Sequence, residues 1–164
     1  MYWHDWVTLA IMATGIVVQT VRGSKTSGGL MMLEAAGGVI AAAAATASAP
    51  GLAGAIHTSE YTVLFVLFVV FLVLAFLIAH WLYAMTGLSF QSLDGILSLF
   101  FGLVMAVTVA HMFLRIMIGS AEGESAQVIA NSPVAREVFQ FQSWNSLLQL
   151  LFKTKASDVN PDLG

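Results

Sequence analysis

Cysteine is absent from this chain of 164 residues, and charged side chains are scarce. The absence of cysteine excludes disulfide bonds and thiolate metal sites within the chain. Only 9% of the residues are charged, against roughly 25% in a typical soluble domain. The six lysines and arginines form no basic patch of the kind that binds nucleic acid, so we expect no nucleic-acid partner. Most of the molecular surface is therefore predicted to face something other than water.

Long apolar runs are what the chain has in place of charge. Hydrophobic residues make up 59% of it, and the longest run extends over residues 61–84, where His80 interrupts it. About 20 apolar residues, at a rise of about 1.5 Å each, match a hydrocarbon core of ~30 Å. This run predicts a transmembrane helix, and the bilayer is expected to be the main partner of the chain.

Four such segments predict an all-α, polytopic membrane protein. The expected transmembrane helices cover residues 6–21, 28–49, 61–84 and 93–118, within a transmembrane domain of residues 1–118. A polar hinge and a C-terminal amphipathic helix are expected in residues 119–155, followed by a flexible tail in residues 156–164.

The amphipathic helix has a recognisable start, because Ser132 and Pro133 are typical of an N-cap and of the first helical position. Apolar residues then recur every three or four positions: Val134, Val138, Phe141, Trp144, Leu148 and Leu151. This pattern suits a helix that lies in the membrane interface. It equally suits a helix that docks on a partner.

The second segment consists mainly of alanine and glycine and carries Glu34. A carboxylate in lipid costs on the order of 2–3 kcal/mol, and alanine offsets almost none of that. We therefore expect this helix to lie inside the bundle, where small residues let helix backbones approach closely. The residues expected at these packed faces are Gly37, Gly38, Ala41, Ala42 and Ala45.

Glu34 and His80 are predicted to lie at a similar depth, which makes a buried carboxylate–imidazole pair plausible. His111 and Arg115 are neighbours one helical turn apart, toward the opposite side. Together these residues could mark a proton or ion path, or they could be structural. We expect no catalytic residue, cofactor or metal site, because no nucleophile elbow, phosphate-binding loop or zincin helix occurs.

Tryptophans near the predicted helix ends are interpreted as interfacial anchors, and these are Trp3, Trp6, Trp81 and Trp144. Arg22 and Lys25 are the basic residues of the first three connections. The excess of positive charge in cytoplasmic loops then predicts that their loop is cytoplasmic. The N- and C-termini are expected on the periplasmic side.

Two stretches resemble the colicin V production (CvpA) family of bacterial inner-membrane proteins. The first is MYWHDWVTLAI with VRGSKTSGGL, which contains Asp5, Arg22 and Gly23. The second is TGLSFQSLDGILSLFFGL, which contains Gly87, Asp94 and Gly102. The chain departs from the family at Gly95, where relatives usually carry an arginine, and at Met105-Ala106, where they often carry Arg-Gly.

The resemblance implies a non-enzymatic, multi-pass protein of the bacterial inner membrane that supports toxin production or export, or envelope homeostasis. An alternative is an accessory or scaffold subunit of a larger membrane complex, with other membrane proteins or a second copy as partner. A third is a small proton-coupled channel or transporter that uses Glu34 and His80.

Overall fold

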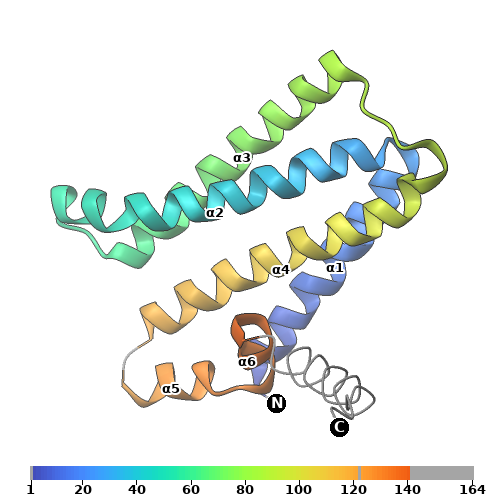
Figure 1. The fold of residues 1–164 in the computed structure, drawn as a ribbon. Coiled ribbons are helices and arrows are strands. Elements are labelled where there is room, and N and C mark those ends of the chain that lie inside the picture. Colours follow the sequence, from blue (N-terminus) through green and yellow to red (C-terminus); the bar gives the residue numbers. More distant parts are fainter. Residues whose placement is uncertain (1, 122, 141–164) are drawn as a thin grey trace, which may run out of the picture.

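A computed structural model describes residues 2–121 and 123–140 of the chain. It confirms the all-α class (Figure 1). The elements are α1 (Trp3–Lys25), α2 (Gly28–Ile56), α3 (Glu60–Thr86), the 3-10 turn η1 (Gln91–Leu93), α4 (Asp94–Ser120), α5 (Glu124–Ala130) and α6 (Pro133–Gln140). Four of the described helices, α1 to α4, are long and apolar enough to cross a membrane.

Two predicted boundaries are corrected by the structure. The second segment was expected to end at residue 49, but α2 continues through Pro50 to Ile56 and is capped by His57 in the left-handed conformation. A proline inside a long apolar helix is tolerated where neighbouring structure satisfies the carbonyl that it frees. The polar hinge expected after residue 118 ends at residue 123, because α5 begins at Glu124.

The four long helices do not pack in chain order. Helix α4 lies between α1 and α2, and α2 in turn packs along α3, whereas α1 and α2 touch little and α3 and α4 touch little (Figure 1). The spatial order is therefore α1, α4, α2, α3. This array leaves long apolar faces uncovered, and α3 buries only four described side chains, those of Val63, Leu64, Phe68 and Ala79.

Small residues on α2 form the seam with its neighbours. Gly38, Ala41 and Ala45 are buried, while Gly37 and Ala42 are half-buried. A Cβ atom at position 37 would lie 3.0 Å from the Cβ of Ala75 on α3, which is tighter than ordinary contact. Close approach of this kind allows dispersion contacts along both backbones, since lipid itself gives helices no hydrophobic reason to associate.

The first turns of the C-terminal region pack on the chain's own α4. The Ser132 hydroxyl accepts a hydrogen bond of 3.1 Å from the Ala135 amide, so it caps α6 as its sequence position predicts. Ala135 and Val138 are buried against Leu114 of α4. The described part of the amphipathic helix therefore turns its apolar side to α4. Residues 141–164, including Trp144, lie outside the described residues.

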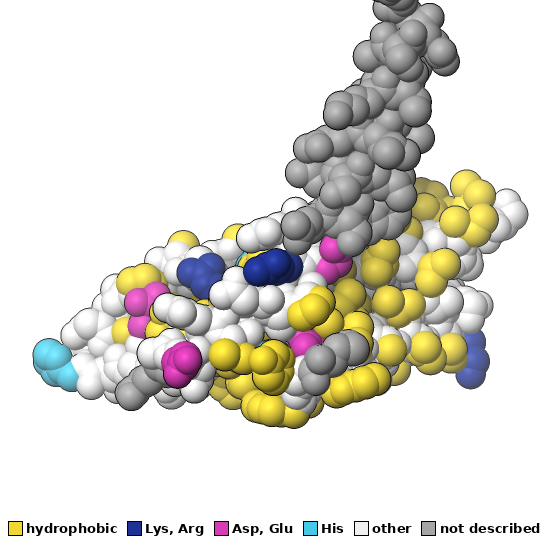
Figure 2. Space-filling model, turned by 90° about the horizontal axis from the view of Figure 1, so that it is seen from below, with side chains coloured by type: hydrophobic (Ala, Val, Ile, Leu, Met, Phe, Trp, Pro, Cys, Tyr) yellow, Lys and Arg dark blue, Asp and Glu magenta, His cyan; other side chains and the backbone are white. Residues whose placement is uncertain are grey.

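Seen from below, charged side chains are isolated spots among hydrophobic and backbone atoms (Figure 2). The exposed faces of the long helices carry large apolar side chains, for example Phe65, Leu77 and Trp81 on α3. A water-exposed monomer rarely shows such extended apolar surface. This surface suits contact with lipid or with other apolar helices.

Candidate functional site

Glu34 is the centre of a polar cluster among apolar helices. Its side chain is 0% exposed. The Arg22 guanidinium donates two hydrogen bonds to it, one from each terminal nitrogen, at 2.8 and 3.1 Å. The Gln19 amide donates a third, at 3.1 Å. The carboxylate is thus held by one helical turn of α1.

The local sequence explains why these groups meet. Gln19 and Arg22 are three residues apart on α1, so their side chains leave the same face of the helix. Residues 26 and 27 alone separate α1 from α2, so the end of α1 lies beside the start of α2. Glu34 is six residues after Gly28, the first residue of α2, which places it about 9 Å along that helix. Arg22, three residues before the end of α1, can reach back to that depth.

His80 lies close to this cluster without being its main partner. Its Nδ1 atom is 3.7 Å from the Glu34 carboxylate, but 3.0 Å from the Phe76 carbonyl oxygen. Because a carbonyl only accepts hydrogen bonds, Nδ1 is the donor there. The His80 side chain is 53% exposed. The structure thus brings the predicted pair together, and Arg22 is the direct partner.

Asp94 and Gly87 organise the same end of the molecule. The Asp94 carboxylate accepts hydrogen bonds from the Gly28 amide at 2.9 Å, the Phe90 amide at 3.0 Å and the Ser89 hydroxyl at 2.9 Å. It therefore ties the start of α2 to the turn that precedes α4. Gly87 ends α3 with a φ of 58°, a left-handed conformation that glycine adopts without strain.

Gly23 and Gly102 allow α1 and α4 to approach. A Cβ atom at Gly23 would overlap the Ser98 side chain, and one at Gly102 would lie 3.0 Å from the Gln19 Cβ. These two contacts flank the turn of α1 that carries Gln19 and Arg22. Gly102 therefore helps to place Gln19 against the Glu34 cluster.

Asp5 lies at the other end of α1, where it is fully buried. Its carboxylate accepts a hydrogen bond of 2.9 Å from the Tyr2 amide, which closes the first turn of the helix. The neighbouring His4 is buried as well, and its Nε2 atom is 3.9 Å from the carboxylate. The aromatic start of the chain is thereby fixed against α1.

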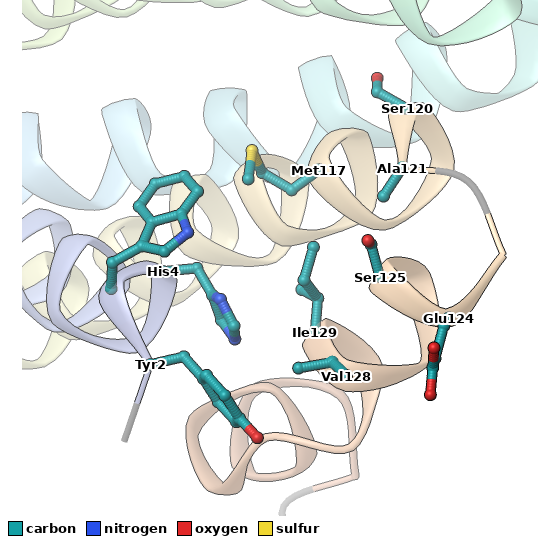
Figure 3. A pocket seen from close by; sticks show the side chains of 10 residues that line it. Tyr2, His4, Met117, Ser120, Ala121, Glu124, Ser125, Val128 and Ile129 are labelled. Atoms are coloured by element: carbon teal, nitrogen blue, oxygen red, sulfur yellow. The ribbon is translucent and has the colours of Figure 1, made fainter.

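A cavity of about 550 Å³ opens beside His4. The side chain of Tyr2, the residue before α1, and side chains of α5 such as Ile129 reach toward it, while Glu124 lies farther from His4 (Figure 3). The His4 Nε2 atom has no hydrogen-bond partner within the part of the chain that the structure describes. The arrangement is a single imidazole among mostly apolar groups.

The predicted pair His111 and Arg115 does not join the Glu34 cluster. Arg115 donates a hydrogen bond of 3.3 Å to the Thr46 hydroxyl of α2. The His111 ring packs edge-on against Phe139, with 4.7 Å between ring centres. Within residues 2–121 and 123–140, no group of three or more metal-ligating side chains comes together.

The described tryptophans lie at the two ends of the helical array. Trp3 and Trp6 are exposed on the first turns of α1. Trp81 is exposed near the end of α3, which lies by the opposite end of α1, as the hydrogen bond from the Ser27 hydroxyl to the Leu88 carbonyl shows. This separation is the one expected of anchors in two membrane interfaces.

Sequence reasoning missed Arg22 as the partner of Glu34. The first span was predicted to end at residue 21, which left Arg22 as a loop charge. The signal that could have found it is Gln19, a polar residue one turn earlier on the same face.

Comparisons with protein-family models, with curated proteins and with solved structures find no match to this chain.

Proposed function

We propose that this chain is a non-enzymatic, multi-pass protein of the bacterial inner membrane that supports toxin production or export, or envelope homeostasis. The observation that carries the proposal is the closed Glu34 cluster within apolar helices. Its carboxylate is fully buried and takes hydrogen bonds from Arg22 and Gln19. The resemblance of the Arg22-Gly23 and Asp94 stretches to the CvpA family supports the same role.

The geometry favours a structural cluster over a proton or ion path. A conducting carboxylate needs a route for water or ions on at least one side, whereas Glu34 is enclosed by hydrogen-bonded partners. The second predicted polar pair makes separate contacts, with Thr46 and Phe139. The cluster therefore acts as a cross-link between α1 and α2, two helices that otherwise touch little.

The proposed orientation places the loop at residues 26–27 in the cytoplasm. Arg22 and Lys25 end α1 on that side, in keeping with the enrichment of basic residues in cytoplasmic loops. The turn at His57 and the start of α1 then face the periplasm. Four crossings return the segment after α4 to the periplasmic side as well.

An accessory-subunit role is the second candidate, favoured by a groove between α2 and α3. The groove encloses about 360 Å³, and small residues of α2 such as Ala36, Gly37 and Ala44 line it. Small side chains allow a helix of another membrane protein to approach closely. Such a partner would cover apolar surface that α2 and α3 leave open.

Gentle detergent extraction from native membranes, followed by sizing and mass spectrometry, separates the two roles. A stoichiometric set of partners supports the subunit role. A monomer or homo-oligomer supports the envelope role.

The envelope role also requires that deletion of the gene makes cells more sensitive to detergent stress, and re-expression of the wild-type chain is the control. If the deletion strain tolerates detergent normally and no partners co-purify, both the envelope role and the subunit role are contradicted.

A further inference from the structure

A second groove crosses α1, α3 and α4 and ends at the Glu34 cluster. It has a volume of about 590 Å³. Its walls are almost wholly apolar, with Ala10 and Val18 from α1, Leu72 and Phe76 from α3, and Ala106 from α4. Thr14, Gln19 and Arg22 are its polar members, and the last two lie at one end.

The dimensions of the groove match a lipid chain. Its α1 wall runs from Val7 to Arg22, a separation of 15 residues, or about 22 Å along the helix. One leaflet of a bilayer contributes about half of a ~30 Å hydrocarbon core. The groove is therefore long enough to hold an acyl chain over the full depth of its leaflet.

The polar end of the groove presents a cation. Arg22 gives two hydrogen bonds to Glu34, yet 40% of its side chain remains exposed. Arginine carries more N–H donors than these two, and its planar fork suits phosphate oxygens. Lys25, on the last turn of α1, adds a second positive charge nearby.

Gln19 adds an acceptor at the same end. Its amide nitrogen donates to Glu34, which fixes the orientation of the amide. Its oxygen is then left without a hydrogen-bond partner among the described residues, although the side chain is only 7% exposed. A buried acceptor without a hydrogen-bond donor is stabilised when a hydroxyl group donates to it.

We propose that this groove binds one anionic glycerophospholipid of the phosphatidylglycerol type. The acyl chain lies along α1 between α3 and α4, the phosphate contacts Arg22, and a glycerol hydroxyl donates a hydrogen bond to the Gln19 oxygen. The site does not depend on the envelope role, because a lipid can be held at this place whether the chain acts alone or within a complex.

The test uses phosphatidylglycerol with a photoactivatable diazirine in one acyl chain, added to the full-length protein in phosphatidylcholine nanodiscs. Peptide mapping is expected to find labels on groove residues, Ala10 and Thr14 above all. Unlabelled phosphatidylglycerol is expected to compete about tenfold better than added phosphatidylcholine. Both lipids carry a phosphate for Arg22, but phosphatidylcholine lacks the glycerol hydroxyl that donates to the Gln19 oxygen, and tenfold is about the factor that one such hydrogen bond provides. Labels spread evenly over the outer face of α3, or equal competition by the two lipids, would overturn the site.

Two exposed alanines on α1 give a matched pair of variants. Ala10→Phe fills the groove and is expected to reduce its labelling severalfold. Ala13→Phe makes the same change at an exposed position that does not line the groove, and labelling is expected to persist. Equal behaviour of the two variants contradicts chain binding in the groove.

The headgroup contact is tested by two changes with opposite expected signs. Glu34→Gln removes the charge that neutralises Arg22, so preference for phosphatidylglycerol over phosphatidylcholine is expected to rise severalfold. The double variant Arg22→Gln/Glu34→Gln is expected to lower the preference below that of the wild type, and the remainder is the contribution of the glycerol hydroxyl at Gln19. Simple loss of structure would lower this lipid preference in both variants. A higher preference in Glu34→Gln together with a lower one in the double variant therefore supports the site. A change in the same direction in both variants contradicts it.

Discussion

At the scale of single residues, the buried Glu34 carboxylate links α1 to α2. A buried charge is costly unless it is paired and hydrogen-bonded. Glu34 meets that condition through hydrogen bonds from Arg22 and Gln19, both on α1. The desolvation cost of the pair makes it a weak source of net stability, but the pair favours the observed register of the two helices, in which the carboxylate is hydrogen-bonded.

Arg22→Ala tests this dependence. Removal of one partner from a buried pair leaves the other charge uncompensated, and we expect a loss of about 3 kcal/mol, at the lower end of the range because Arg22 is partly exposed. Thermal unfolding of the purified protein in detergent measures the change. Lys25→Ala, on the exposed last turn of α1, is the control and is expected to have little effect.

The double variant Arg22→Ala/Glu34→Ala sharpens this test. Removal of both charges relieves the desolvation penalty, so we expect it to be more stable than Arg22→Ala alone. A double variant that is less stable by the sum of two separate losses contradicts the coupling of the pair.

The sequence predicted that Glu34 is buried, because an acidic residue within an alanine-rich apolar run has to face other helices. It did not predict the partner. His80 lies at a similar depth, but its Nδ1 atom is committed to the Phe76 carbonyl of its own helix. Whether a histidine in an apolar helix turns to its own backbone or to a neighbour depends on rotamer and helix rotation, which hydropathy does not report.

At the scale of elements, the Asp94 carboxylate joins the start of α2 to the turn before α4, beside the hydrogen bond from the Ser27 hydroxyl to the Leu88 carbonyl. Asp94 accepts from the Gly28 amide, one of the donors that the start of α2 cannot satisfy within the helix. We expect Asp94→Ala to lower the free energy of unfolding by about 1–2 kcal/mol, the usual cost of a lost cap. Backbone amide hydrogen exchange at residues 28–31 measures the local effect.

Asp94→Asn is the matched variant, because its amide oxygen still accepts a hydrogen bond. It is expected to keep more of the protection than Asp94→Ala. Equal exchange rates in the wild type and in Asp94→Ala contradict the role of this residue as a cap.

The contact of α1 with α4 is tested by a pair of glycine substitutions. Gly23→Ala places a Cβ atom against the Ser98 side chain, so α1 and α4 have to separate, and we expect a loss of about 1–3 kcal/mol. Gly51→Ala meets no atom within 4 Å and lies inside α2, so we expect a gain of up to about 1 kcal/mol. Unfolding in detergent measures both, and a harmless Gly23→Ala contradicts the tight contact.

Element boundaries followed the apolar runs only in part. The second segment was expected to end at residue 49, directly before Pro50, but a single proline in a long helix removes one hydrogen bond and leaves the others intact. Helix α5 was missed because its short sequence, ESAQVIA, is as polar as a loop. Its burial of Ile129 against α4 is a tertiary contact, and such contacts override local composition.

At the scale of the whole molecule, the order of the helices is the feature that sequence reasoning left open. Four apolar segments with short connections are compatible with a bundle in chain order. The structure instead inserts α4 between α1 and α2. The glycines at positions 23 and 102 favour this order, because they let α4 approach α1 closely. This preference depends on which faces meet, so it appears only in three dimensions.

The last prediction concerns which end of the helical array faces the cytoplasm. A cysteine-free chain allows single-cysteine labelling without further changes. Ser24 is exposed on the last turn of α1, close to the start of α2, and Thr58 is exposed just after the end of α2. If Arg22 and Lys25 mark the cytoplasmic side, a membrane-impermeant maleimide should label Thr58→Cys in intact cells and Ser24→Cys only after permeabilisation. The reverse pattern contradicts the proposed orientation but still supports a membrane crossing by α2. Labelling of both variants in intact cells contradicts that crossing. Because α2 carries the buried Glu34 and packs against both α3 and α4, this measurement tests the helix on which the whole arrangement depends.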